Sequence, residues 1–145
     1  SPPLCICDIP EKNMIATGCA DMTILVSSTI DPVPAKQFQP LHVWPTVSSQ
    51  MSLAWMPSNE LLYSGSENGD IHAWRISDQC CQETLKAHTD MVLSLLALNV
   101  TNNLVSASMD AKMVQIHWIY DLPPKKVHRT HSKMIGIGNK INYSK

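Results

Sequence analysis

Three polar residues in the second half of the chain carry the side-chain types of a serine hydrolase. His88, Ser94 and Asp110 could supply a general base, a nucleophile and an orienting carboxylate for acyl transfer. Such a set works only when the three groups meet in space, and spacing along the chain does not show this. The elements that position these residues must therefore decide between a catalytic and a structural role.

A hairpin pattern recurs three times along the chain. Each copy has a short apolar run, a small residue, a turn residue three positions later and then alternating apolar positions, which predicts two strands around a tight turn. The small residues are Gly18, Gly65 and Ala107, spaced by 47 and 42 residues, and this period suits a four-stranded repeat unit. Thirteen residues before them, further apolar strands begin at Cys5, Ser52 and Ser94.

In the third copy, the dipeptide Ala87-His88 is followed by Ser94, Asp110 and Trp118. This order and spacing resembles the WD-repeat family, and the resemblance covers nearly the whole chain. It implies an all-β fold, a partial WD40 β-propeller with about three four-stranded antiparallel sheets, called blades, plus the stub of a fourth. We expect one propeller fragment over residues 1–145, with blades at 1–40, 41–80 and 81–124. Residues 125–145 would begin the next blade or form a divergent tail.

The resemblance also implies a structural role for the polar residues. His88 would bond Asp110 and Ser94, and Ser94 would meet the indole of Trp118, in a buried network that is rigid when every member is satisfied. Trp118 lies two residues beyond its expected place, which Ile116 occupies. A bulge would have to bring the indole into position.

The second copy argues against catalysis. Thr46 and Asn68 stand at the positions of His88 and Asp110. A structural pair tolerates the loss of both partners together, whereas the same change would abolish a catalytic pair. We therefore expect no enzymatic activity, and a hydrolase that uses His88, Ser94 and Asp110 is kept as a remote alternative.

Composition and charge exclude several classes of function. Charged residues make up 16% of the chain, below the roughly 25% of ordinary soluble domains, and the formal net charge is −1. This indicates a surface that is largely covered, and it gives no overall attraction to nucleic acid or anionic lipid. No apolar run approaches the ~20 residues that cross a bilayer. We expect no membrane contact, no cofactor and no small-molecule ligand.

The five cysteines do not predict a metal site. Cys5 and Cys7 alternate along a strand, which places their thiols on opposite faces, and no second pair follows at ligand spacing. Their odd number favours a reducing, intracellular compartment. The chain begins at Ser1 without an initiator methionine, from which we expect a trimmed chain.

These features predict a non-catalytic scaffold that mediates protein–protein interactions in a larger intracellular, multi-subunit assembly. Loops on a rigid framework carry recognition, and large exposed aromatic side chains anchor interfaces. We expect Phe38, Trp44 and Trp55 to be such anchors. The divergent repeats resemble WD-repeat proteins of cilia and sperm flagella, which implies a cytoplasmic location at the cytoskeleton or the axoneme.

A basic segment at residues 125–133 supports an alternative function. Lys125, Lys126 and Arg129 could bind nucleic acid or an acidic polymer such as a tubulin tail. Net charge and aromatic spacing give no nucleic-acid footprint, and a solvated outer strand explains the same residues. The salt dependence of binding separates the two functions, because a contact with a polyanion weakens steeply as salt increases.

Overall fold

The structure, a computed structural model, describes the backbone of residues 1–30, 40–120 and 130–138 and the side chains of residues 1–30 and 40–116. Within these ranges the chain is almost entirely β-strand, arranged as three antiparallel sheets of four strands each. Strands pair with their neighbours in sequence order, as the three hairpin patterns predict. The predicted all-β fold built from four-stranded sheets is confirmed.

The first sheet is formed by the N-terminal third of the chain. Its strands are β1 (Pro3–Ile9), β2 (Met14–Cys19), β3 (Thr23–Ser28) and β4 (Pro40–Pro45). A 3-10 turn, η1 (Pro10–Lys12), joins β1 to β2.

The second and third sheets repeat the same order of strands. The second sheet contains β5 (Gln50–Met56), β6 (Leu61–Ser66), β7 (Asp70–Arg75) and β8 (Cys80–Lys86). The third sheet contains β9 (Val92–Leu98), β10 (Asn103–Ser108), β11 (Met113–Tyr120) and β12 (Thr130–Gly138).

The last strand corrects one expectation. Residues 130–138 were expected to lie in the start of a next blade or in a divergent tail, but β12 pairs with β11 from Thr130 opposite Tyr120 to Gly138 opposite Met113. The ladder uses the backbone groups of β12, so this strand completes the third sheet at its outer edge and does not start a fourth.

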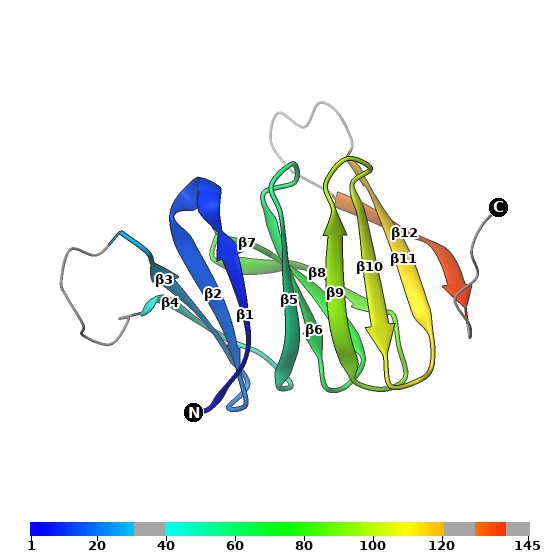
Figure 1. Ribbon diagram of the computed structural model, residues 1–145, viewed down its shortest axis with the longest axis horizontal. Coiled ribbons are helices and arrows are strands. Elements are labelled where there is room, and N and C mark those ends of the chain that lie inside the picture. Colours follow the sequence, from blue (N-terminus) through cyan, green and yellow to red (C-terminus); the bar gives the residue numbers. More distant parts are fainter. Residues whose placement is uncertain (31–39, 121–129, 139–145) are drawn as a thin grey trace.

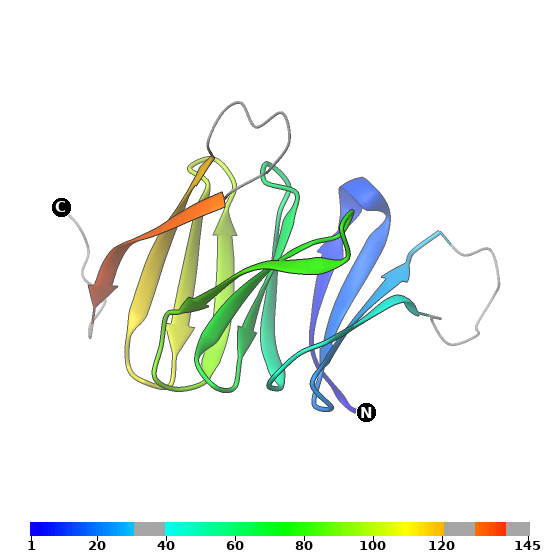
Figure 2. The same cartoon turned by 180° about the vertical axis from the view of Figure 1, so that it is seen from behind.

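The sheets pack on one another through their first strands. β1 contacts β5, and β5 contacts β9. Figure 1 shows these three strands side by side, and Figure 2 shows the outer strands β4, β8 and β12 from behind. This is the radial arrangement that the resemblance to a β-propeller predicts.

One polar contact recurs at both joints between sheets. Cys5 Sγ lies 3.4 Å from the backbone oxygen of Gln50, and Ser52 donates its hydroxyl to the backbone oxygen of Val92 at 3.2 Å. Burial raises the pKa of the Cys5 thiol to about 11, so the thiol stays protonated and can act as the donor. The two joints are therefore built alike.

The small residues of the repeat allow this close packing. A Cβ added to Gly18 would come within 3.0 Å of the Gln50 side chain, and one added to Gly65 within 2.5 Å of the Val92 side chain. Any larger residue at these positions would push the neighbouring sheet away. Two apolar clusters fill the joints behind these contacts.

Candidate functional site

His88 is the centre of a buried polar cluster in the third sheet. It lies in the connection from β8 to β9, and its side chain is fully buried. Nδ1 lies 3.0 Å from Asp110 Oδ2 in the β10–β11 turn, and Nε2 lies 2.7 Å from Ser106 Oγ on β10. The structure thus brings His88 and Asp110 together across 21 intervening residues.

Hydrogen bonds from the backbone hold both partners in place. Asp110 accepts the N–H groups of Thr89 at 3.1 Å and of Lys112 at 2.9 Å. His88 donates its own N–H to the backbone oxygen of Gly69 at 3.2 Å. Gly69 has a φ of +91°, and a Cβ there would collide with the backbone oxygen of His88. The tight turn of the second sheet therefore supports the histidine of the third.

The pKa of Asp110 is lowered in this cluster. Burial works against the ionised form, but the backbone N–H groups of Thr89 and Lys112 and the contact with His88 outweigh it. An ionised carboxylate only accepts, so Nδ1 of His88 must carry the proton that faces it. In the neutral ring, Nε2 then accepts the hydroxyl of Ser106.

This geometry has the order of a catalytic triad but lacks access for a substrate. Ser106 has no exposed surface, and the side chain of Asp110 is only 4% exposed. A nucleophile needs room for a reacting atom about 3 Å away, which a sealed hydroxyl does not offer. The cluster is suited to holding the loop, the strand and the turn together.

The predicted serine of this network must be corrected. Ser94 lies opposite Ala107 on the neighbouring strand, and both residues are exposed. Cross-strand partners share a face of the sheet, whereas Ser106, one residue away from Ala107, points to the other face. The hydroxyl beside His88 therefore belongs to Ser106. A signal for it existed in the sequence, because Ser64 and Ser106 each directly precede the small residue of their copy.

In the second sheet, the equivalent serine bonds a tryptophan in place of a histidine. Trp74 donates its indole N–H to Ser64 at 2.8 Å, and Ser64 holds the same place as Ser106. Thr46, at the position of His88, turns its hydroxyl to the backbone oxygen of Ser48 at 2.7 Å. The loop that enters this sheet therefore supplies a short hydroxyl side chain where the third sheet has an imidazole.

Ile116 takes the place of Trp74 in the third sheet. Leu104 pairs with Ile116 just as Leu62 pairs with Trp74, and Ile116 is fully buried. The register of β10 with β11 is regular at this point, so it contains no bulge that would shift Trp118 by two residues. The side chain of Trp118 lies outside the described residues.

The tryptophans expected at the surface are buried. Trp44 is 4% exposed and Trp55 is 8% exposed, which contradicts their prediction as exposed anchors. The Trp44 ring stacks on that of Trp74, with centroids 5.4 Å apart, and Trp55 donates its indole N–H to Glu11 at 2.8 Å. Their large apolar surfaces fill the joint between the first two sheets. Phe38, Lys125, Lys126 and Arg129 lie outside the described residues.

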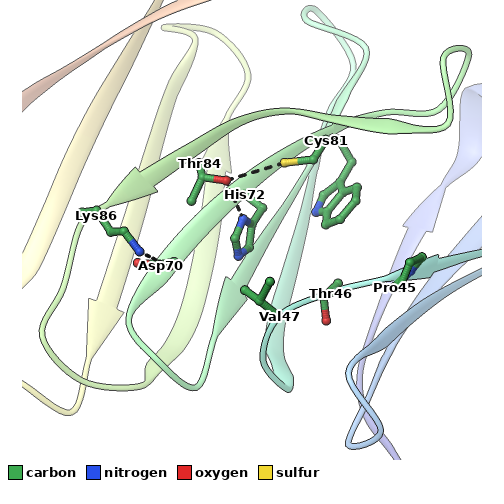
Figure 3. A pocket seen from close by; sticks show the side chains of 9 residues that line it. Pro45, Thr46, Val47, Asp70, His72, Cys81, Thr84 and Lys86 are labelled. Carbon is green, nitrogen blue, oxygen red and sulfur yellow. Dashed lines mark hydrogen bonds and ion pairs between the residues drawn. The ribbon is translucent and has the colours of Figure 1, made fainter.

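A hollow of about 410 Å³ opens between the first and second sheets, on the side of the outer strands. Figure 3 shows it between the β4–β5 connection and β8, with His72 of β7 at its centre. The hollow is lined by Pro45, Thr46, Val47, Asp70, His72, Trp74, Cys81, Thr84 and Lys86.

His72 is the most unusual residue of this hollow. It is 5% exposed, and its Nδ1 lies 2.9 Å from Thr84 Oγ1. Nε2 has no hydrogen-bond partner among the described residues. Burial lowers the pKa of the imidazole; the charge of Asp70 opposes this effect and that of Lys86 adds to it. A neutral ring with one unpaired nitrogen therefore faces the hollow.

Neither a metal centre nor a membrane-spanning helix is found within the described ranges. No group of three His, Cys, Asp or Glu residues there could hold a metal ion. The helical content there offers no segment long and apolar enough to cross a bilayer.

Comparison with known proteins identifies the repeat. A family model described as "WD domain, G-beta repeat" matches residues 38–75. "Nuclear distribution protein PAC1" of Candida glabrata is 32% identical over 74 residues, which cover 50% of this chain and 15% of that protein. "Cilia- and flagella-associated protein 337 B" of Tetrahymena thermophila is 28% identical over 85 residues, 57% of this chain and 7% of that protein. The chain thus spans a small part of the relatives it matches.

Solved structures share the arrangement of the sheets. "Crystal structure of RRP9 WD40 repeats" superposes with a TM-score of 0.69 at 23% identity, over 78% of this chain and 34% of that one. "Crystal Structure of Mitotic Checkpoint Complex" gives a TM-score of 0.69 at 17% identity, over 82% of this chain and 36% of that one. At these identities the likeness concerns the fold alone. Residues 38–75 therefore carry a WD40 repeat, and the three sheets have the fold of consecutive blades in a WD40 β-propeller.

Proposed function

We propose that the protein is a non-catalytic scaffold that binds other proteins in an intracellular assembly. The observation that carries this proposal is the apolar character of the outward faces of the first and third sheets. Binding of proteins is the general role of WD40 propellers, and the sealed cluster around His88 and Asp110 offers no reaction that would compete with it.

The outward face of the first sheet is a continuous apolar row. Ile6 lies opposite Thr17, Thr17 opposite Leu25, and Leu25 opposite Val43, so all four share one face from β1 to β4. Ile6 is 68% exposed and Val43 is 54% exposed. A contiguous exposed apolar patch of this kind marks a surface that further β-sheet covers, either from another blade or from a partner protein.

The third sheet presents a similar face at the other end. Leu96 is 58% exposed and Met113 is 37% exposed, and Ser94 and Ala107 lie on the same side. At the two joints inside the chain, the equivalent face is covered by the first strand of the next sheet. The repeated joint therefore supports β-sheet as the element that packs on these faces.

Charged substitutions on the two faces test the proposal. We expect Ile6→Asp and Leu96→Asp in the intact protein to lose co-purifying partners while the melting temperature stays within a few degrees of the native value, because both side chains are exposed. Val100→Asp is the matched control, since Val100 is 99% exposed in a turn outside both faces. An unchanged set of partners at unchanged stoichiometry in both variants would refute the proposal. A fall of many degrees in the melting temperature would also refute it, because it would place further blades of the same protein on these faces. A steep loss of partners with salt would favour the basic segment instead.

The cilium or flagellum is the location that we propose for this assembly. One matched relative bears the name "Cilia- and flagella-associated protein 337 B", and this name is the support. A fluorescent tag on the intact protein in ciliated cells tests the location. Signal along the axoneme is expected, and signal spread evenly through the cell body would contradict it.

A further inference from the structure

The hollow beside His72 is lined by Thr46, the residue that stands where the third sheet has His88. Thr46 and His88 lie 42 residues apart, as do Gly65 and Ala107, so the two residues hold equivalent positions. In the third sheet the ring of His88 is sealed between the loop and β10. In the second sheet the shorter Thr46 bonds its own loop instead, and a hollow of about 410 Å³ remains.

One polar group inside this hollow lacks a partner. The His72 side chain points into it, and Figure 3 shows the ring with one nitrogen toward Thr84 and the other toward Val47. The second nitrogen, Nε2, is buried without a hydrogen-bond partner in the part of the chain that the structure describes. A buried polar atom in this state costs free energy that an occupant with a matching group would recover.

The walls and the nitrogen together define the chemistry of the occupant. Pro45, Val47 and the Trp74 indole present apolar surface, which suits an aromatic ring. The Thr84 hydroxyl can donate to Nδ1 or accept from it, so Nε2 is a donor in one tautomer and an acceptor in the other. A phenol matches both cases, because its hydroxyl donates and accepts. An indole or a backbone carbonyl matches only one.

We propose that this hollow binds the side chain of a tyrosine from a partner protein, with the phenol hydroxyl hydrogen-bonded to His72 Nε2. The proposal rests on the scaffold function in one respect only, namely that the phenol is supplied by a protein. The inserted ring lies beside Thr46, which stands at the position of His88 in the third sheet. The joint between the first and second sheets thereby becomes a specific docking point, away from the apolar end faces.

Binding of p-cresol to the intact protein, followed by NMR, tests the chemistry. We expect shifts of the Trp74 indole N–H and the His72 ring signals, and an affinity about 5- to 10-fold higher for p-cresol than for toluene, because only the phenol pairs with Nε2. His72→Leu should bring the two affinities to within about twofold of each other. Equal affinities in the native protein, or shifts that leave both residues unchanged, would overturn the proposal.

A substitution that copies the third sheet tests the location. Thr46→His should fill the hollow with an imidazole and lower the affinity for p-cresol by about tenfold or more, through steric exclusion. Thr89→His is the matched control, because Thr89 is an exposed threonine in the equivalent loop of the third sheet, and it should bind p-cresol as the native protein does. Native affinity in Thr46→His would place the site elsewhere and refute the proposal.

The source of the phenol is tested with blocked amino acids. N-acetyltyrosinamide should bind at least as tightly as p-cresol and more tightly than N-acetylphenylalaninamide. If N-acetyltyrosinamide binds about tenfold more weakly than p-cresol, a protein backbone does not fit the opening and the tyrosine of a partner is excluded. These outcomes are independent of the variants on the apolar end faces, so the two proposals can fail separately.

Discussion

In the second sheet, the indole of Trp74 donates to Ser64, whereas in the third sheet the serine at the same position, Ser106, bonds the imidazole of His88. The partner comes from the neighbouring strand in one case and from the connecting loop in the other. Both serines are fully buried. A buried hydroxyl without a hydrogen-bond partner is costly, so the fold must provide one at this position. Either the neighbouring strand or the connecting loop can supply it.

The largest effect on stability is expected from the polar cluster around His88 in the third sheet. We expect His88→Ala to lower the free energy of unfolding by about 3 kcal/mol, because Asp110 and Ser106 each lose a short hydrogen bond in a buried site and the ring leaves a cavity. Urea unfolding measures the effect. Thr89→Ala, an exposed neighbour, should cost less than about 0.5 kcal/mol. Equal losses in the two variants would show that the cluster contributes little.

The two sheets should also differ at the small residue of the repeat. Gly65→Ala is expected to cost about 2 kcal/mol, because the added Cβ would lie 2.5 Å from the Val92 side chain. Ala107→Gly removes a Cβ from an exposed position and should cost about 0.5–1 kcal/mol, from backbone entropy alone. Thermal unfolding of both variants checks this. A smaller loss for Gly65→Ala than for Ala107→Gly would contradict the close joint.

A histidine in place of Thr46 would give the second sheet the same loop side chain as the third sheet has at His88. Thr46→His is expected to raise the free energy of unfolding by about 1 kcal/mol, because the larger ring fills part of the hollow that Thr46 lines. The same urea titration measures this gain. A clear loss of stability would mean that the loop of the second sheet cannot admit the ring in the position of His88.

The smallest expected difference is in the response to pH. Burial lowers the pKa of His72 from its ordinary value of 6.5, so the unfolded chain binds more protons there and stability falls as the pH decreases below about 6.5. The pKa of Asp110 is lowered from 3.8, so its stabilisation is lost only as the pH falls below about 3.8. Unfolding measured between pH 3 and pH 8 should show both steps. His72→Gln should remove the upper step and leave the lower one, and persistence of the upper step would assign it to another group.

The sequence was sufficient for the strands and for the joints. Two strands approach each other closely at Gly18 and at Gly65. Such an approach requires small residues, and these are visible in the sequence at a fixed spacing among the alternating apolar positions. The pairing of His88 with Asp110 followed from the resemblance to WD-repeat proteins. What these features share is that the same residue types recur at the same place in successive repeat units.

The rest depended on the directions and the neighbours of individual side chains, which the spacing does not encode. Choosing Ser94 over Ser106 required the register of β9 against β10, which fixes the face of each side chain. Trp44 was expected to be an exposed aromatic anchor, but its ring stacks on Trp74 of the next sheet and is buried. The hollow beside His72 could not be predicted, because its walls come from both the first and the second sheet, and the distance between the sheets is not encoded in the spacing of residues.

The match of the repeat to residues 38–75 has a consequence for how such a chain can grow. It takes in β4, which closes the first sheet, together with β5, β6 and β7 of the second. The repeat unit of the sequence is therefore offset by one strand from the four-stranded sheet of the structure. Duplicating such a segment adds one new sheet, and the first strand of the copy completes the preceding sheet. The chain can therefore lengthen without leaving an unpaired strand edge where the copy joins. Each sheet is then connected covalently to the next through the backbone.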